Sequence, residues 1–111
     1  MLISELDTPA LLIDLDIMER NLSKVAAYAK KHDLRLRPHT KTHKIPALAR
    51  KQIELGAAGI TVAKTTEAEV MLNASPSDLL IAYPVIGAAK LERPRSIAAK
   101  TQVNVAVDSV E

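Results

Sequence analysis

The sequence is poor in the residue types from which many functional sites are built. It contains no cysteine, no tryptophan and no phenylalanine, and its two tyrosines are Tyr28 and Tyr83. A chain without cysteine forms neither a disulfide nor a thiolate metal site, and this composition suits a reducing compartment. Two tyrosines also give few platforms on which nucleic-acid bases could stack. We therefore expect no nucleic-acid partner and a core built from leucine, isoleucine, valine and alanine.

The sequence also lacks a strong excess of charge and a long apolar run. Fifteen lysines and arginines stand against thirteen acidic residues, for a formal net charge of +2, which is too small to steer the protein toward a polyanion. No run approaches the roughly 18 apolar residues of a membrane span, and the N-terminus lacks the regions of a signal peptide. These two absences make a cytoplasmic protein without a membrane contact the default expectation. The length of 111 residues, of which 48% are hydrophobic, predicts one globular domain.

Apolar spacing and terminal signals predict four helices. They cover about residues 17–31, 46–56, 66 into the segment 73–78, and 87–100. Asp16 with Glu19, and Thr66 with Glu69, have the spacing of capping boxes at two of these helix starts. Pro46 suits the first position of the second helix.

Short apolar runs between these helices predict four strands, which start near residues 34, 59, 79 and 103. The starts lie roughly 20–25 residues apart, the length of one βα unit with short loops, so the sheet should be parallel. In the first strand Leu34 and Leu36 share one face, while Arg35 and Arg37 share the other. A sheet covered by helices on both faces should be apolar on both. One polar face instead favours the wall of a barrel.

A complete (β/α)8 barrel needs roughly 200 residues or more. The predicted architecture is therefore α/β: parallel βα repeats that form about half of a (β/α)8 TIM-type barrel, preceded by an N-terminal helix. On this interpretation residues 1–111 are the N-terminal part of a longer protein.

The segment RLRPHTKTHK, residues 35–44, gathers basic side chains at the end of the first predicted strand. Alternation places Arg35, Arg37, His39 and Lys41 on the face that would line the lumen. The carboxyl ends of barrel strands carry the active site, and cationic neighbours with partial burial favour the neutral form of a lysine. A neutral lysine forms an imine with a carbonyl compound, so Lys41 is the candidate Schiff-base residue.

Three other interpretations of this segment stay open. It would be a solvated basic loop if its side chains point to water, as most lysines do. His39 and His43 are four residues apart, a metal-ligand spacing on a helix, but Pro38 favours an extended segment and no carboxylate lies nearby in sequence. A phosphate or nucleic-acid patch is the third alternative, although the segment is short and has no interleaved aromatics. No metal site is predicted.

Five segments, taken in order, resemble a known family. They are LDTPALLIDLDIMERNLSKVAAYA, LRLRPHTKTHK, GAAGITVAKTTEAEVM, DLLIAYPVIG and VNVAVDSVE. They are similar to the N-terminal half of the D-threonine aldolase and D-serine dehydratase-like family, which belongs to the alanine-racemase-type (fold type III) pyridoxal phosphate enzymes. The resemblance covers essentially all 111 residues, and RPHTKTHK is its most specific part. It implies the N-terminal part of an alanine racemase-like cofactor-binding barrel, without the remaining barrel and the C-terminal β domain.

The resemblance implies that pyridoxal 5'-phosphate is held by the first lysine of KTHK, which is Lys41; Lys44 is the less suited of the two. Three further side chains are candidates for cofactor binding, each with an alternative role. His39 would otherwise be a wall residue, Arg37 a partner for a lumen carboxylate, and Tyr83 a space-filling residue after the third strand. Thr65, Thr66 and Glu67 follow the second strand and could also face a ligand.

The function that the resemblance implies is a lyase acting on D-3-hydroxy amino acids. The cofactor ring is an electron sink for a carbanion at the substrate Cα, so cleavage of Cα–Cβ (aldolase) and removal of the α-proton followed by water (dehydratase) both stay open. The divalent-metal ligands and the phosphate-binding loops of the family lie in sequence that this chain does not contain, so little activity is expected from these residues alone. The alternative is a non-catalytic half-barrel that self-associates through open strand edges. A homo-oligomer is expected.

Overall fold

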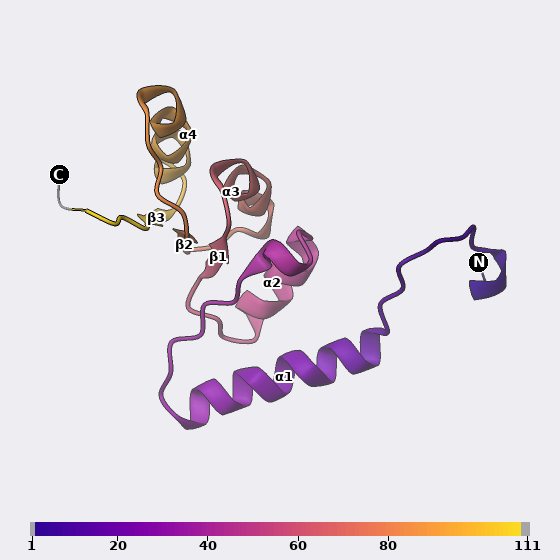
Figure 1. The fold of residues 1–111 in the computed structure, drawn as a ribbon. Coiled ribbons are helices and arrows are strands. Elements are labelled where there is room, and N and C mark those ends of the chain that lie inside the picture. The colour runs from indigo at the N-terminus through magenta and orange to yellow at the C-terminus, as the bar shows by residue number, and fades with distance from the viewer. Residues whose placement is uncertain (1, 110–111) are drawn as a thin grey trace.

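A computed structural model describes residues 2–109 of the chain (Figure 1). The helices are α1 (Leu15–Lys31), α2 (Pro46–Glu54), α3 (Thr65–Met71) and α4 (Ala88–Ala98). The strands are β1 (Ile60–Val62), β2 (Asp78–Ile81) and β3 (Gln102–Val105). Short 3₁₀ turns lie at Ile3–Glu5, Thr40–Thr42 and Leu72–Ala74. The four predicted helices are confirmed within a few residues at each end.

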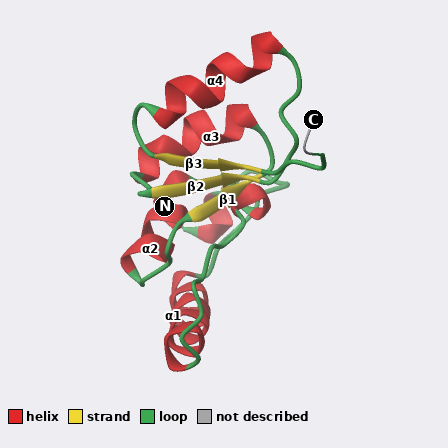
Figure 2. Cartoon of the chain, turned by 90° about the vertical axis from the view of Figure 1, so that its left-hand side faces the viewer, coloured by secondary structure: helices red, strands yellow, loops and turns green. Residues whose placement is uncertain are grey.

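The three strands form one parallel sheet in the order β1-β2-β3 (Figure 2). Ile60 pairs with Leu79, and Leu79 pairs with Val103. Each connection contains a helix, α3 or α4, because a parallel pair needs a crossover of a dozen or more residues. The prediction of a parallel α/β fold is confirmed.

The core lies between this sheet and the helices α2, α3 and α4, which run along one side of it (Figure 1). The core members are Ala49, Ile60, Val62, Ala68, Met71, Ala74, Leu79, Ile81 and Ile97, all at most 2% exposed. None is aromatic, so branched aliphatic side chains from the strands pack against alanines, Met71 and Ile97 from the helical segments. The predicted aliphatic core is confirmed.

The first predicted strand is wrong as a strand. Residues 34–38 are extended and lie beside β1, where the N–H groups of Ala58 and Thr61 donate to the carbonyls of Leu36 and Pro38, each at 2.8 Å. Apart from the bridge between His39 and Thr61, this segment forms no ladder. Proline has no N–H to donate, so one side of the pairing is interrupted at Pro38. The described residues therefore contain three strands instead of four.

Both predicted capping boxes are also wrong. Helix α1 begins two residues early, because the carboxylate of Asp14 accepts from the N–H of Ile17 at 2.9 Å and caps the helix in place of Asp16. Helix α3 begins after Lys64 without a side-chain cap. Its first turn is instead fixed by Glu67, whose carboxylate accepts from the N–H of Ala63 at 2.9 Å.

Helix α1 lies apart from the sheet (Figure 1). Ala29 is its one buried residue, and Leu15, Ile17 and Tyr28 are between 46% and 61% exposed. An ion pair between Glu19 and Lys51 links α1 to α2. Within residues 2–109, no helix has both the length and the apolar character that a membrane crossing requires.

Candidate active site

The turn Thr40–Thr42, which carries Lys41, is anchored to the sheet through Thr40. This side chain is 1% exposed, and its hydroxyl donates to the carbonyl of Thr61 in β1 at 3.1 Å. The carbonyl of Thr40 accepts from the N–H groups of His43 at 3.2 Å and Lys44 at 2.8 Å. These bonds fix the backbone on both sides of Lys41 relative to β1.

His39 completes the turn from its amino side. Its ring Nδ1 accepts from the backbone N–H of Lys41 at 3.2 Å, and its carbonyl accepts from the hydroxyl of Thr42 at 3.4 Å. The ring is half-buried. Because Nδ1 accepts, the proton of a neutral His39 is on Nε2, which leaves that nitrogen able to donate to a ligand.

The two lysines of KTHK differ in their surroundings. Lys41 is exposed, and its amine makes no hydrogen bond or ion pair within residues 2–109. Lys44 has a left-handed backbone (φ 55°), and its Nζ lies 3.3 Å from a carboxylate oxygen of Glu67. Burial raises the pKa of Glu67, but the N–H of Ala63 and the bond and charge of Lys44 outweigh it and hold that pKa below its ordinary value. The partial burial expected for Lys41 is not found.

His43 fixes the start of helix α2. Its Nδ1 accepts from the N–H of Ile45 at 3.0 Å, and burial lowers its pKa. Gln52 approaches the buried Nε2 and opposes this shift, without reaching ordinary hydrogen-bond geometry. His43 is therefore neutral near pH 7 and holds the residues after Lys44 in place.

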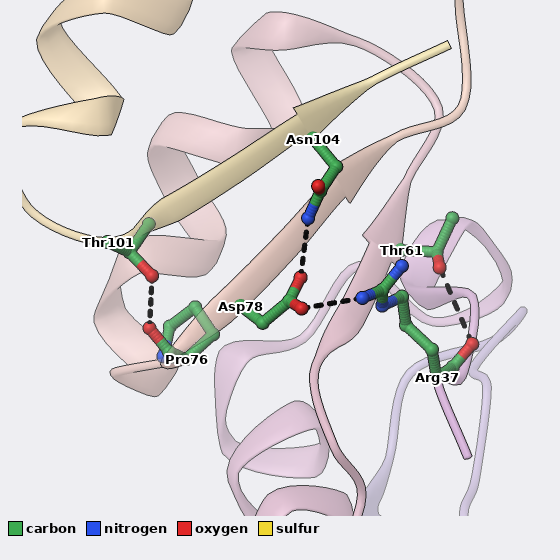
Figure 3. A network of polar contacts seen from close by, with 6 residues as sticks. All are labelled: Arg37, Thr61, Pro76, Asp78, Thr101 and Asn104. Carbon is green, nitrogen blue, oxygen red and sulfur yellow. Dashed lines mark hydrogen bonds and ion pairs between the residues drawn. The ribbon is translucent and has the colours of Figure 1, made fainter. Parts of the chain in front are cut away.

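Arg37 belongs to a polar network on the face of the sheet opposite the core (Figure 3). Its guanidinium donates to one oxygen of Asp78 at 2.5 Å, and Asn104 donates to the other oxygen at 3.0 Å. The hydroxyl of Thr61 donates to the carbonyl of Arg37 at 3.4 Å. Asp78, which binds both partners, is the first residue of β2 and so lies toward the amino ends of the strands. Lys41 comes two residues after His39, which is bridged to Thr61 of β1, and so lies toward the carboxyl ends of the strands.

Tyr83 follows β2 and is 44% exposed. It lines a hollow together with the basic residues Lys64, Lys90 and Arg93. Lys41 is not among the residues that line this hollow. The four predicted cofactor-binding residues are thus divided: His39 and Lys41 share the turn, Arg37 belongs to the polar network, and Tyr83 faces the hollow.

Asp78 is the main residue that the sequence analysis missed. It is 6% exposed and holds both Arg37 and Asn104. Its signal in the sequence is a carboxylate at the first position of an apolar strand, where only a buried partner would compensate its desolvation. Among residues 2–109, no group of three or more histidine and acidic side chains is arranged to hold a metal ion.

No family model matches the sequence, but individual proteins do. The D-threonine aldolase of Arthrobacter sp. is 40% identical over 107 residues, which are 96% of this chain and 28% of that enzyme. The crystal structure of D-threonine aldolase from Filomicrobium marinum matches with a TM-score of 0.92 at 46% identity, over 96% of this chain and 29% of that one. The D-threo-3-hydroxyaspartate dehydratase from Delftia sp. HT23 matches with a TM-score of 0.84 at 37% identity, over 96% and 28%. The chain thus spans less than a third of the length of these relatives.

Proposed function

Since this chain is homologous over nearly its whole length to the D-threonine aldolase and D-threo-3-hydroxyaspartate dehydratase family, we propose that it is the lysine-bearing part of a pyridoxal-phosphate-dependent lyase acting on D-3-hydroxy amino acids. The names of the relatives include an aldolase and a dehydratase, so the proposal covers Cα–Cβ cleavage and elimination of water alike. The observation that carries it is the unpaired amine of Lys41 on a turn that is fixed to the sheet.

The contrast with Lys44 supports the choice of Lys41. Glu67 holds the amine of Lys44 in an ion pair at 3.3 Å, so this amine is already engaged. The amine of Lys41 has no ion-pair partner within residues 2–109 and is available to attack a carbonyl carbon. Lys41 is therefore the residue proposed to form the Schiff base.

The turn positions that amine through its backbone. Thr40 binds the carbonyl of Thr61, and His39 binds the N–H of Lys41. The backbone of Lys41 is thereby held toward the carboxyl ends of the parallel strands, the edge at which barrels and open α/β sheets bind ligands. The side chain remains free to reach a ligand there.

Pyridoxal phosphate, when bound, supplies an electron sink for negative charge that develops at the substrate Cα. The residues of the turn fit it, since Lys41 offers a free amine and His39 offers Nε2 as a donor. Cofactor-binding roles for Arg37 and Tyr83 stay predictions, because Arg37 is engaged by Asp78 and Tyr83 lines a separate hollow. The divalent metal that the resemblance implies is not proposed to bind these residues, which offer no cluster of ligands.

The sheet is proposed to be part of a (β/α)8 barrel wall. Helices α2, α3 and α4 cover one face, and Arg37, Asp78 and Asn104 occupy the other. A barrel has the same division between an outer ring of helices and an inner surface. The consecutive order of the strands also agrees with such a wall.

The experiment is chemical labelling of the protein with pyridoxal phosphate. The complex is reduced with borohydride, digested and analysed by mass spectrometry for modified lysines. We expect modification at Lys41 that disappears in Lys41→Ala and persists in Lys44→Ala. Modification that is lost only in Lys44→Ala, or that is spread evenly over exposed lysines, contradicts the assignment.

Self-association is a second candidate function, and the surface of α1 favours it. Leu15, Ile17, Val25 and Tyr28 are large and at least 46% exposed, and within the described residues β3 pairs on one side only. Exposed apolar patches and unpaired strand edges are both sites of association. Light scattering over a range of protein concentrations tests this function, and a monomer at every concentration argues against it.

A further inference from the structure

A basic hollow lies at the carboxyl end of the sheet, apart from the Lys41 turn. Its volume is about 540 Å³. Its polar lining consists of Lys64, Thr65, Thr66, Tyr83, Lys90 and Arg93. These residues come from the end of the β1–α3 connection, the first turn of α3, the segment after β2, and α4. The hollow is therefore formed by the tertiary fold and not by a single basic stretch of sequence.

The positive charge of this hollow is only partly balanced. Arg93 pairs with Glu69 at 3.5 Å. Lys64 and Lys90 make no ion pair within 4.0 Å in the part of the chain that the structure describes. The charge of Lys64 acts on Glu67, but that carboxylate is already bound by Lys44 and the N–H of Ala63. Two lysine charges therefore remain for a ligand.

Uncommitted hydroxyl groups accompany these charges. The hydroxyl groups of Thr65, Thr66 and Tyr83 form no hydrogen bond with any other group within residues 2–109. A hydroxyl can donate one hydrogen bond to an anionic oxygen. No carboxylate is among the lining residues. The polar part of the lining is thus cationic and rich in donors, and it lies beside the apolar Ala63 and Val85.

We propose that this hollow binds a small dianion whose charge is on oxygen, either a phosphate monoester or a dicarboxylate. Two ammonium groups match two negative charges, and hydrogen bonds between charged groups and oxygen anions are stronger than neutral ones. Ligands of parallel α/β sheets bind outside the carboxyl ends of the strands, which is where the hollow lies. The proposal does not depend on a Schiff base at Lys41.

Calorimetric titration at constant ionic strength tests this site with two probes, inorganic phosphate and succinate. We expect saturable binding of at least one probe, and the tighter of the two identifies the source of the dianion. The double variant Lys64→Gln/Lys90→Gln should weaken binding about tenfold or more, which corresponds to about 1.4 kcal/mol. The matched control, Lys30→Gln/Lys31→Gln, removes the same charge from exposed positions of α1 and should bind as the unchanged protein does.

Two further variants separate this site from the fold and from the proposed catalytic lysine. Tyr83→Phe removes one hydroxyl and should weaken binding while the circular dichroism spectrum stays the same. Lys41→Ala should leave binding unchanged even if it abolishes labelling by pyridoxal phosphate. Absence of saturable binding to both probes, or an equal loss in the two double-lysine variants, overturns the proposal.

Discussion

The guanidinium of Arg37 lies 2.5 Å from the carboxylate of Asp78, although 41 positions separate the two residues and β1 lies between their segments. The second oxygen of Asp78 binds Asn104 of β3. One buried carboxylate thus joins the extended segment before the Lys41 turn to two strands of the sheet. The network gives this segment a fixed place even though it forms no regular strand.

Replacement of Asp78 by alanine should destabilise the protein by about 2–3 kcal/mol, the usual cost of leaving a partly buried charged group without its partner. The Arg37 side chain is 28% exposed, and removal of its partner leaves a charge that water solvates only in part. Urea unfolding measures the loss. The matched control is Glu92→Ala, which removes an ion pair to Arg95 between side chains that are 69% and 80% exposed and should cost about 0.5 kcal/mol or less. Equal costs for the two variants would contradict a structural role for Asp78.

Gly59→Ala should be more harmful than Gly56→Ala. A Cβ at Gly59 would lie 2.6 Å from the backbone oxygen of Asp78, so β1 and β2 would have to move apart. At Gly56 a Cβ meets no atom within 4 Å, and the cost comes from its left-handed backbone (φ 101°) alone, about 1–2 kcal/mol. We expect Gly59→Ala to cost more than this in thermal or urea unfolding. The reverse order would show that the two strands do not approach so closely.

Asp14→Ala should weaken helix α1 by about 1 kcal/mol, the usual cost of a lost N-cap. Asp14 accepts from the N–H of Ile17, whereas Asp16 is inside the first turn. Asp16→Ala therefore serves as the matched control and should lose only the weaker interaction with the helix dipole. Helical circular dichroism during thermal unfolding compares the two. A larger effect at Asp16 would restore the capping box that the sequence suggested.

The free energy of unfolding should decrease in two pH ranges as the pH is lowered. Burial lowers the pKa of His43 below 6.5, so the unfolded chain takes up this proton first and stability falls as the pH drops below 6.5. The pKa of Glu67 in the folded protein is below 4.5, so its contribution is present above 4.5 and is lost as the pH falls through the lower value. Unfolding free energy as a function of pH tests both. His43→Gln should flatten the upper window, and Glu67→Gln the lower one.

Much of the fold could be predicted because its signals repeat. The apolar spacing of Met18, Leu22 and Val25, and the regular interval between apolar runs, each depend on several residues. The errors fall where the signal is a single residue. Asp14 and Asp16 are both good N-caps, and only the backbone decides between them. Pro38 ended a pattern that otherwise alternates as a strand does.

Only those features of the candidate site that depend on residues close together in sequence could be predicted. Lys41 follows an extended segment, and its neighbours Thr40 and His39 are local in sequence, so its place at the end of that segment was accessible. The exposure of the Lys41 side chain could not be predicted, because the surroundings of the basic side chains depend on partners that are distant in sequence. Asp78 and Glu67, from other parts of the sequence, bind Arg37 and Lys44. Such pairs become visible only when the strands are placed side by side.

The isolation of α1 from the core has a consequence for how the molecule opens. With Ala29 as its one buried residue, this helix has few contacts that must break before its amides exchange with deuterium. Amides of β1 and β2 are enclosed by the core and should exchange only when the whole sheet opens. Unfolding is then not one cooperative event, because the longest helix melts ahead of the strands. An early loss of helical signal would therefore overstate the fraction of the protein that has unfolded.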